Sequence, residues 1–261
     1  MLGVQYDGAL WRGWQTQPGG GTVQDELEKA LCKFSLNEIS TTCAGRTDAG
    51  VHALEQVVHF DTDLERELFS WVRGVNAFLP RSIAVRWARE LEFDPVNNFH
   101  ARFSATARTY HYVLYNHPVR SPLLCGKAGW VFRLLDIEPM REAAGYLIGT
   151  HDFSAFRAAE CQANTPVKTM HEIRIDRRDD LIVFTLRANA FLHHMVRNIV
   201  GSLIVVGNGN QSAEWLKEVL EHRDRSRAAP TFMPDGLYLA KIDYDAKWGL
   251  PQELFVALPS L

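Results

Sequence analysis

The spacing of apolar and polar positions divides the first part of the chain into strands and helices. Alternation over residues 2–6 predicts a strand that ends at the turn signal Asp7-Gly8. Apolar residues at helical spacing over 23–34 predict an amphipathic helix with Thr22 at its N-cap. Further strands are predicted at 39–43, 56–60, 83–89 and 108–115, and a further helix at 64–75.

A second half of the chain begins near Asp136. Helices are predicted there at 140–148, 191–206 and 213–222, and strands at 172–176, 181–187 and 237–242. Because strands and helices are mixed without strict alternation, the pattern favours an α+β fold over a Rossmann-type sheet.

The composition limits where the protein works. With 261 residues, 46% of them hydrophobic, the chain can bury a core as one large domain or two halves. No apolar run approaches the roughly 20 residues that cross a bilayer, and the N-terminus lacks a signal segment. We therefore expect a cytoplasmic protein that does not enter a membrane. The four cysteines are widely spaced, without a CxxC pair, and are predicted to be reduced and buried.

Charge is unevenly distributed along the sequence. The chain carries a net charge of -3, yet residues 100–200 carry 13 basic and 9 acidic side chains. This excess permits a local phosphate-binding surface, although its size is also typical of ordinary surface variation.

The stretch from Ala44 to His52 places one carboxylate, Asp48, between two glycines in a loop that joins two predicted strands. Gly45 and Gly50 permit a tight turn and also let a ligand approach the main chain. An aspartate in such a loop is usually a turn residue, so spacing alone favours that role over a catalytic one.

Arg197 is the only formally charged residue of the apolar helix predicted at 191–206. An unpaired buried guanidinium is costly, so we expect it to meet a carboxylate or a phosphate, with Asp48 as a candidate. His193 and His194 would point about 100° apart on a helix and could not chelate one ion together. We therefore expect no metal site here.

The strand predicted at 108–115 carries Arg108, Tyr110, Tyr112 and Leu114 on one face, because side chains alternate along a strand. Two aromatic rings beside a cation can form part of a core or a platform for an unstacked base. The pattern leaves both interpretations open.

Together these segments resemble the tRNA pseudouridine synthase A (TruA) family, over nearly the whole chain. The resemblance extends from residues 4–8 to residues 236–239 and rests on separated stretches in the family's order: 44–52, 74–77, 99–108 with Tyr110, 149–153 and 189–201. Residues 230–234 depart from it by making an unusual, proline-flanked approach to the final predicted strand.

The resemblance implies a pseudouridine synthase fold, with a mixed, mainly antiparallel sheet flanked by helices and two related halves. Residues 1–116 would carry the catalytic aspartate loop and 117–261 the Arg197 helix, within one continuous catalytic domain. It implies Asp48 as nucleophile, Arg197 as its partner, Tyr110 stacking on the target base and Arg46 holding the flipped nucleotide.

The implied reaction isomerises uridine to pseudouridine in the anticodon arm of tRNA, at tRNA positions 38 to 40. It needs no cofactor and no metal. The resemblance also implies a homodimer whose subunits share each tRNA.

Other functions fit parts of the sequence. A non-catalytic RNA-binding or folding module would explain the basic middle, but not Asp48, Tyr110 and Arg197 together. A nucleoside or glycoside hydrolase could also use Asp48, and it would release free uracil. A metal-dependent hydrolase would draw its ligands from His151, Asp152, His193 and His194, but their spacing is not convincing.

Overall fold

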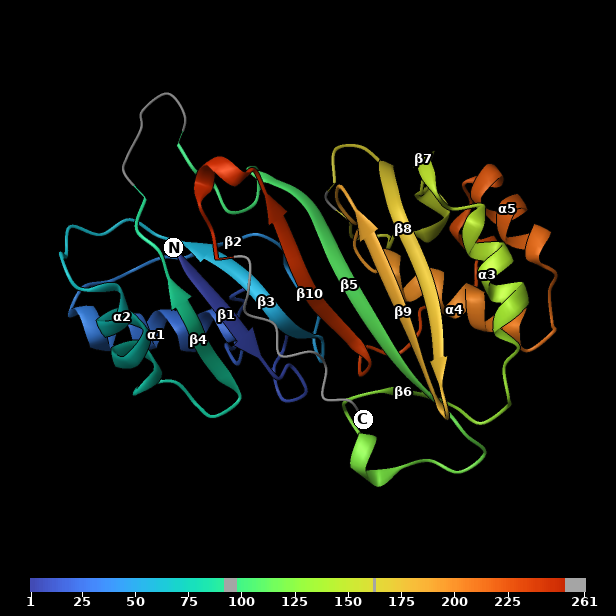
Figure 1. The fold of residues 1–261 in the computed structure, drawn as a ribbon, viewed down its shortest axis with the longest axis horizontal. Helices are drawn as coiled ribbons and strands as arrows, with labels where there is room; N and C mark the ends of the chain where they lie inside the picture. Colours follow the sequence, from blue (N-terminus) through green and yellow to red (C-terminus); the bar gives the residue numbers. More distant parts are fainter. Residues whose placement is uncertain (92–97, 162, 252–261) are drawn as a thin grey trace. The chain divides into compact units, whose positions relative to one another are not determined.

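The computed structural model describes residues 1–91, 98–161 and 163–251. The chain forms two compact units (Figure 1): the first comprises Met1–Thr106 and Leu239–Leu261, the second Ala107–Tyr238. These compact units are defined by contacts within the structure. The predicted halves, 1–116 and 117–261, follow instead from a family resemblance, and the division into these halves stays a prediction.

The first unit is built on a sheet with the strand order β4-β1-β3-β10. Strand β1 (Leu2–Tyr6) pairs antiparallel with both β3 (His52–His59) and β4 (Ile83–Ala88). The short β2 (Thr42–Cys43) also pairs antiparallel with β3. Strand β10 (Leu237–Tyr244) lies beside β3 and brings the end of the sequence into this unit.

Among the described residues, two helices belong to the first unit. Helix α1 (Val23–Ser35) begins at the predicted cap, where Thr22 and Asp25 bond each other's backbone. Helix α2 (Leu68–Asn76) packs on β4 and against α1 (Figure 1). It starts later than the predicted residue 64, because the Leu64 amide bonds the Thr62 hydroxyl in a local turn instead.

The second unit contains strands in the order β5-β9-β8-β7. These are β5 (Ala105–Asn116), β9 (Leu181–Ala188), β8 (Val167–Arg178) and β7 (Gly149–Asp152), and each neighbouring pair is antiparallel. Strand β6 (Gly129–Val131) adds to β5 in the parallel sense. Both units therefore have the expected mainly antiparallel sheet and flanking helices of an α+β fold.

Three helices pack together in the second unit: α3 (Ile137–Gly145), α4 (Met195–Gly207) and α5 (Ala213–His222). Helix α3 contacts strand β8 as well as α4 and α5. Helix α3 begins earlier than the predicted residue 140, because the Asp136 carboxylate accepts a hydrogen bond from the Glu138 amide and caps the helix.

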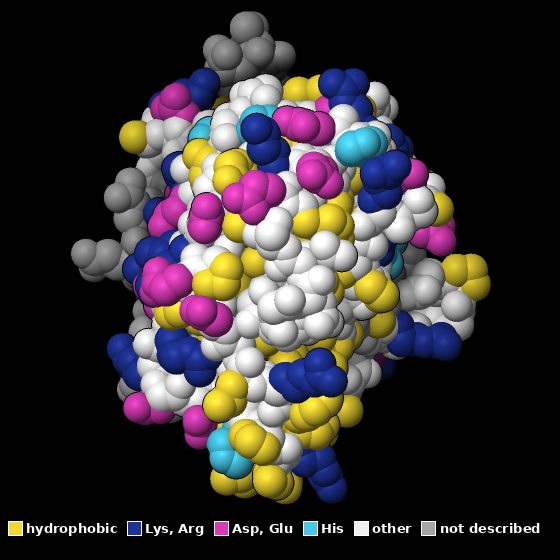
Figure 2. Space-filling model, turned by 90° about the vertical axis from the view of Figure 1, so that its right-hand side faces the viewer, with side chains coloured by type: hydrophobic (Ala, Val, Ile, Leu, Met, Phe, Trp, Pro, Cys, Tyr) yellow, Lys and Arg dark blue, Asp and Glu magenta, His cyan; other side chains and the backbone are white. Residues whose placement is uncertain are grey.

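The face shown in Figure 2 carries acidic and basic side chains interspersed, without a large patch of one charge.

Short 3-10 turns join these elements at Pro122–Leu124, Ser154–Phe156, Arg225–Arg227 and Ala246–Trp248. Among the helices of the described residues, none combines the length and apolar character needed to span a bilayer.

All four cysteines are free, as expected, but Cys125 is exposed and Cys32 half-buried, so the prediction of burial was wrong for these two. Cys125 follows a 3-10 turn with no buried residue, and Cys32 lies toward the edge of the buried face of α1.

Candidate active site

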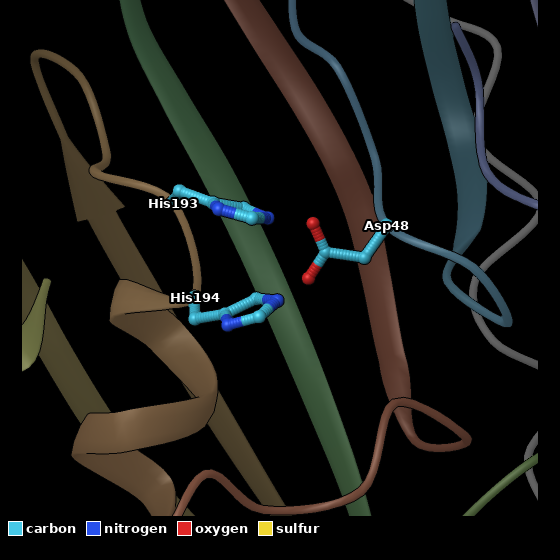
Figure 3. A group of neighbouring side chains, drawn as sticks. All are labelled: Asp48, His193 and His194. Carbon is cyan, nitrogen blue, oxygen red and sulfur yellow. The ribbon is translucent and has the colours of Figure 1, made fainter. Parts of the chain in front are cut away.

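Asp48 lies in the loop between β2 and β3, with its side chain half-buried (Figure 3). The Val51 amide donates to the Asp48 carbonyl oxygen at 3.1 Å, and Gly50 has a φ of 80°. Asp48 is therefore a turn residue through its main chain, as its spacing suggested. This bond is made by the main chain and would form with any residue at position 48.

The Asp48 loop is held by the loop that follows β1. Trp14 donates its amide to the Thr47 carbonyl oxygen at 3.0 Å, and Gly50 donates to that of Trp11 at 3.2 Å. Gly13, at a φ of 94°, lies so close that a Cβ would stand 2.8 Å from the Thr47 oxygen. Backbone contacts thus fix the aspartate on both sides.

Strands β1 and β3 hold the same loop through two side chains. Gln56 is fully buried, accepts the Gly45 amide at 3.3 Å and donates to the Gly45 carbonyl oxygen. The Tyr6 hydroxyl lies 2.7 Å from that of Thr47. A buried amide and a buried phenol place the loop at the end of the sheet. Neither residue stands out in the sequence, because both fall inside strands whose other residues are mostly apolar.

Arg46 is exposed on this loop, two residues before Asp48. Burial raises the pKa of the neighbouring Cys43 thiol to about 11, against the opposing effect of the positive charges of Arg46 and Arg102. The thiol is therefore neutral near pH 7 and is not a competing nucleophile.

Tyr110 and Tyr112 lie on one face of β5, as predicted, but differ in their surroundings. Tyr112 is completely buried, donates to the Met233 carbonyl oxygen at 2.9 Å, and burial raises the pKa of its hydroxyl. Tyr110 retains 9% of its surface, and its ring meets Phe191 edge to face at 5.0 Å. Tyr112 is thus a core residue, and only Tyr110 remains a candidate platform for a base.

Arg197 lies in the first turn of α4 and is half-buried. Its Nε donates to the Phe232 carbonyl oxygen at 2.8 Å, and the Phe232 amide donates to the Arg197 carbonyl oxygen at 3.4 Å. The sequence predicted a carboxylate or phosphate partner and did not anticipate this carbonyl. Pairing of Arg197 with Asp48 would join the two units and stays a prediction.

His193 and His194 are arranged differently from the prediction. Helix α4 starts only at Met195, since His194 is its N-cap with a φ of 62°, outside the helical region. The two imidazole centroids lie 3.9 Å apart, so the rings lie side by side, as Figure 3 shows. The argument that helical geometry would separate them was therefore wrong. Two imidazoles can supply two ligands to a zinc ion, so the absence of a metal stays a prediction.

His151 and Asp152 make local bonds. The His151 Nε2 lies 2.8 Å from the Ile148 carbonyl oxygen. Asp152 accepts from both the amide and the hydroxyl of Ser154, at 2.9 and 2.6 Å. Burial tends to raise the pKa of Asp152, but these bonds and the charge of Arg223 lower it below its usual value. Asp152 is therefore a charged residue whose side chain bonds Ser154, the first residue of the 3-10 turn that follows.

Comparison with known proteins shows which family the chain is similar to. The family model described as tRNA pseudouridine synthase matches residues 3–104 and 143–245, one segment toward each end of the chain. Such a pair of matches fits two related halves.

Curated relatives named tRNA pseudouridine synthase A are similar over almost their full length. That of Herminiimonas arsenicoxydans is 74% identical, covering 97% of this chain and 92% of the relative. The relative from Janthinobacterium sp. (strain Marseille) is 72% identical, and the match covers 97% of this chain and 94% of the relative. The relative from Paraburkholderia phymatum is 61% identical, and the match covers 96% of this chain and 92% of the relative. A rigidly held aspartate loop, a fold of the expected class and these similarities agree, and the chain belongs to the tRNA pseudouridine synthase family.

Proposed function

We propose that this chain isomerises uridine to pseudouridine in the anticodon arm of tRNA, at tRNA positions 38 to 40, with Asp48 as the nucleophile. The observation that supports this most is the Asp48 loop. Its backbone is bonded on both sides, so the position of residue 48 is fixed by contacts with the loop that follows β1. Preorganisation of one reactive group is what a reaction without a cofactor requires.

The reaction is an internal rearrangement. The bond between uracil N1 and ribose C1′ breaks, the base turns, and a bond forms between C5 and C1′. C5 loses its hydrogen as a proton and N1 gains one, so atoms and electrons balance without an oxidant or reductant. A carboxylate can attack C6 of the base or C1′ of the ribose, or can transfer protons while the base is detached.

The other proposed residues serve this carboxylate and its substrate. Uracil stacked in a stem cannot present its reacting atoms, so the nucleotide must be flipped out at a cost of a few kcal/mol. Tyr110 would return part of this cost by stacking on the base, and exposed Arg46 would hold the flipped nucleotide. Arg197 would keep Asp48 ionised by its positive charge.

A homodimer, in which two subunits share each tRNA, is part of the same proposal. The net charge of the chain is -3, and its basic excess is confined to the middle of the sequence. Two copies would double the number of cations that line one RNA-binding surface, and phosphate neutralisation dominates RNA affinity.

The proposal is tested by incubating the protein with a full tRNA and with an isolated anticodon arm, then mapping pseudouridine by position. We expect product at positions 38 to 40 in both RNAs. Free uracil in place of pseudouridine would instead support a glycosidic hydrolase. Binding without either product would support a non-catalytic RNA-binding module.

A further inference from the structure

Residues 225–236 form a strap, the segment that runs from the 3-10 turn Arg225–Arg227 to the start of β10, and this strap lies along helix α4. A Cβ added to Gly201 would stand 2.7 Å from the Pro230 carbonyl oxygen and 3.6 Å from the Phe232 Cβ. A glycine on the helix therefore lets the strap approach the helix backbone closely. The strap includes residues 230–234, the proline-flanked stretch that departs from the family resemblance.

Phe232 is the point at which the strap touches Arg197. Its carbonyl oxygen accepts from the Arg197 Nε, and its amide donates back to the Arg197 carbonyl oxygen. An acceptor bonded to Nε constrains the orientation of a planar guanidinium. The direction of the Arg197 charge thus depends on where the strap holds Phe232.

Asn198, the residue after Arg197, connects the helix to the strap just before Phe232. Its side chain is completely buried. Its Oδ1 accepts from the Thr231 hydroxyl at 2.7 Å and from Arg225 Nη2 at 3.1 Å, while its Nδ2 donates to the Phe156 carbonyl oxygen at 2.8 Å. A side-chain amide can do both, because its oxygen accepts from two donors while its nitrogen donates to a carbonyl oxygen.

Arg225 and Thr231 close this network, since Arg225 Nη2 also lies 3.2 Å from the Thr231 hydroxyl. One helix turn further along, the Ser202 hydroxyl donates to the Asn198 carbonyl oxygen at 2.9 Å and accepts the Ala229 amide at 3.3 Å. The strap is thus bonded to α4 on the N-terminal side of Phe232 at two successive points. Loss of a buried partner would leave polar groups unsatisfied and release the strap.

We infer that Asn198 is a positioning residue that acts through Thr231 and the Phe232 carbonyl oxygen to orient the Arg197 guanidinium for the isomerisation. Asn198 touches no reacting atom. The inference rests on the proposed function, in which Arg197 supports Asp48. It extends the set of functional residues to a network that lies entirely within the second unit.

The test compares Asn198→Leu and Thr231→Val with wild type, using the anticodon arm as substrate. Each variant removes hydrogen bonds at similar side-chain volume. Because Thr231 is half-buried whereas Asn198 is buried, the fold should tolerate Thr231→Val more easily than Asn198→Leu. We expect kcat to fall on the order of tenfold to a hundredfold, as misplaced catalytic groups do, with KM for the RNA little changed. Thr231→Ser, which keeps the hydroxyl, should restore kcat.

Two controls separate positioning from general destabilisation. Ser226→Ala removes an exposed hydroxyl of the same segment that bonds Asp224, and kcat should be unchanged. In an Arg197→Lys background, Thr231→Val should have little further effect, because the group that it orients is already gone.

The outcomes distinguish this inference from the proposed function. If wild type makes no pseudouridine, the proposed function fails. If wild type is active and folded Thr231→Val keeps the wild-type kcat, the positioning role is overturned. The same conclusion follows if Thr231→Val lowers kcat by the same factor in the wild-type and Arg197→Lys backgrounds.

Discussion

The Trp14 amide donates to the Thr47 carbonyl oxygen at 3.0 Å, so the residue just before Asp48 is bonded to a loop distant in the sequence. Gly13 lies against the same oxygen, closely enough that a Cβ would have to displace it. The first loop of the protein thereby sets the position of the Asp48 backbone. We expect changes in this loop to affect the reaction without touching the carboxylate.

Replacing Gly13 by alanine should lower kcat by about tenfold or more, since small displacements of a catalytic group have large effects on rate. Gly209→Ala is the matched control: Gly209 also has a positive φ, of 76°, but a Cβ there would meet no atom within 4 Å. Both variants carry the conformational cost of alanine at positive φ, and Gly13→Ala adds the clash with the Thr47 oxygen, so kcat is compared at a temperature where both variants are folded. Equal kcat values for the two variants would contradict the role assigned to Gly13.

The buried carboxyl of Glu55 should make stability depend on pH. Glu55 is 6% exposed on β3, and its Oε2 is the buried side-chain atom without a hydrogen-bond partner among the described residues. Burial raises its pKa to about 7, despite the Ile242 amide and Lys241, while Asp243 adds to the increase. The folded state therefore holds this proton at a pH where the unfolded state has released it.

Stability contributed by the protonated Glu55 is fully present below about pH 4.5, the usual pKa, and is lost as pH rises toward 7. Glu55→Gln removes the ionisation, so the variant should gain stability over wild type at pH 8, by at most about 3 kcal/mol, and little at pH 5. Denaturant unfolding at both pH values measures this difference. Exposed Glu65→Gln is the control, and a Glu55→Gln variant equally affected at both pH values would count against the explanation.

Tyr110 should matter for the reaction rather than for folding. Tyr110→Leu removes the proposed stacking surface, which is worth about 1–3 kcal/mol per base, and should lower the single-turnover rate at least tenfold. Tyr115→Leu, at the other end of β5, removes a half-buried ring that stacks on His117 and should leave the rate unchanged. Comparable rates for the two variants would remove Tyr110 from the proposed site.

Metal chelation should leave activity unchanged. His193 and His194 are adjacent rings that could attract a transition metal, but the proposed rearrangement has no step that requires one. Pseudouridine formation is measured before and after dialysis against a chelator. Activity that disappears on dialysis and returns with added zinc would show that the reaction requires a metal ion and would contradict this expectation.

Periodicity predicted most elements because each buries one face. Helix α5 begins and ends where expected, and β9 differs by a single residue. The start of α4 was missed because Phe191 and Leu192 continue the apolar pattern although the chain is not helical there. The spacing of apolar residues indicates which residues are buried. It does not indicate the left-handed backbone conformation of His194, which makes the helix begin later.

Site residues were predictable where their chemistry is unusual for their surroundings. A lone arginine in an apolar helix and a carboxylate between glycines drew attention to Arg197 and Asp48. Asn198 carried a similar signal, since a buried amide must have partners, but neutral polar residues in a helix are easily passed over. Gly13 could not be assigned, because a loop glycine does not reveal which backbone approaches it.

The central claim, that Asp48 is the nucleophile, is tested most directly by single-turnover kinetics of Asp48→Asn with anticodon-arm RNA. Exposed Asp63→Asn, a carboxylate loss in the same unit, is the matched control. The account predicts that Asp48→Asn forms pseudouridine about a thousandfold more slowly or not at all while still binding RNA, and that Asp63→Asn is unaffected. Pseudouridine formation by Asp48→Asn within about twofold of the wild-type rate would contradict it.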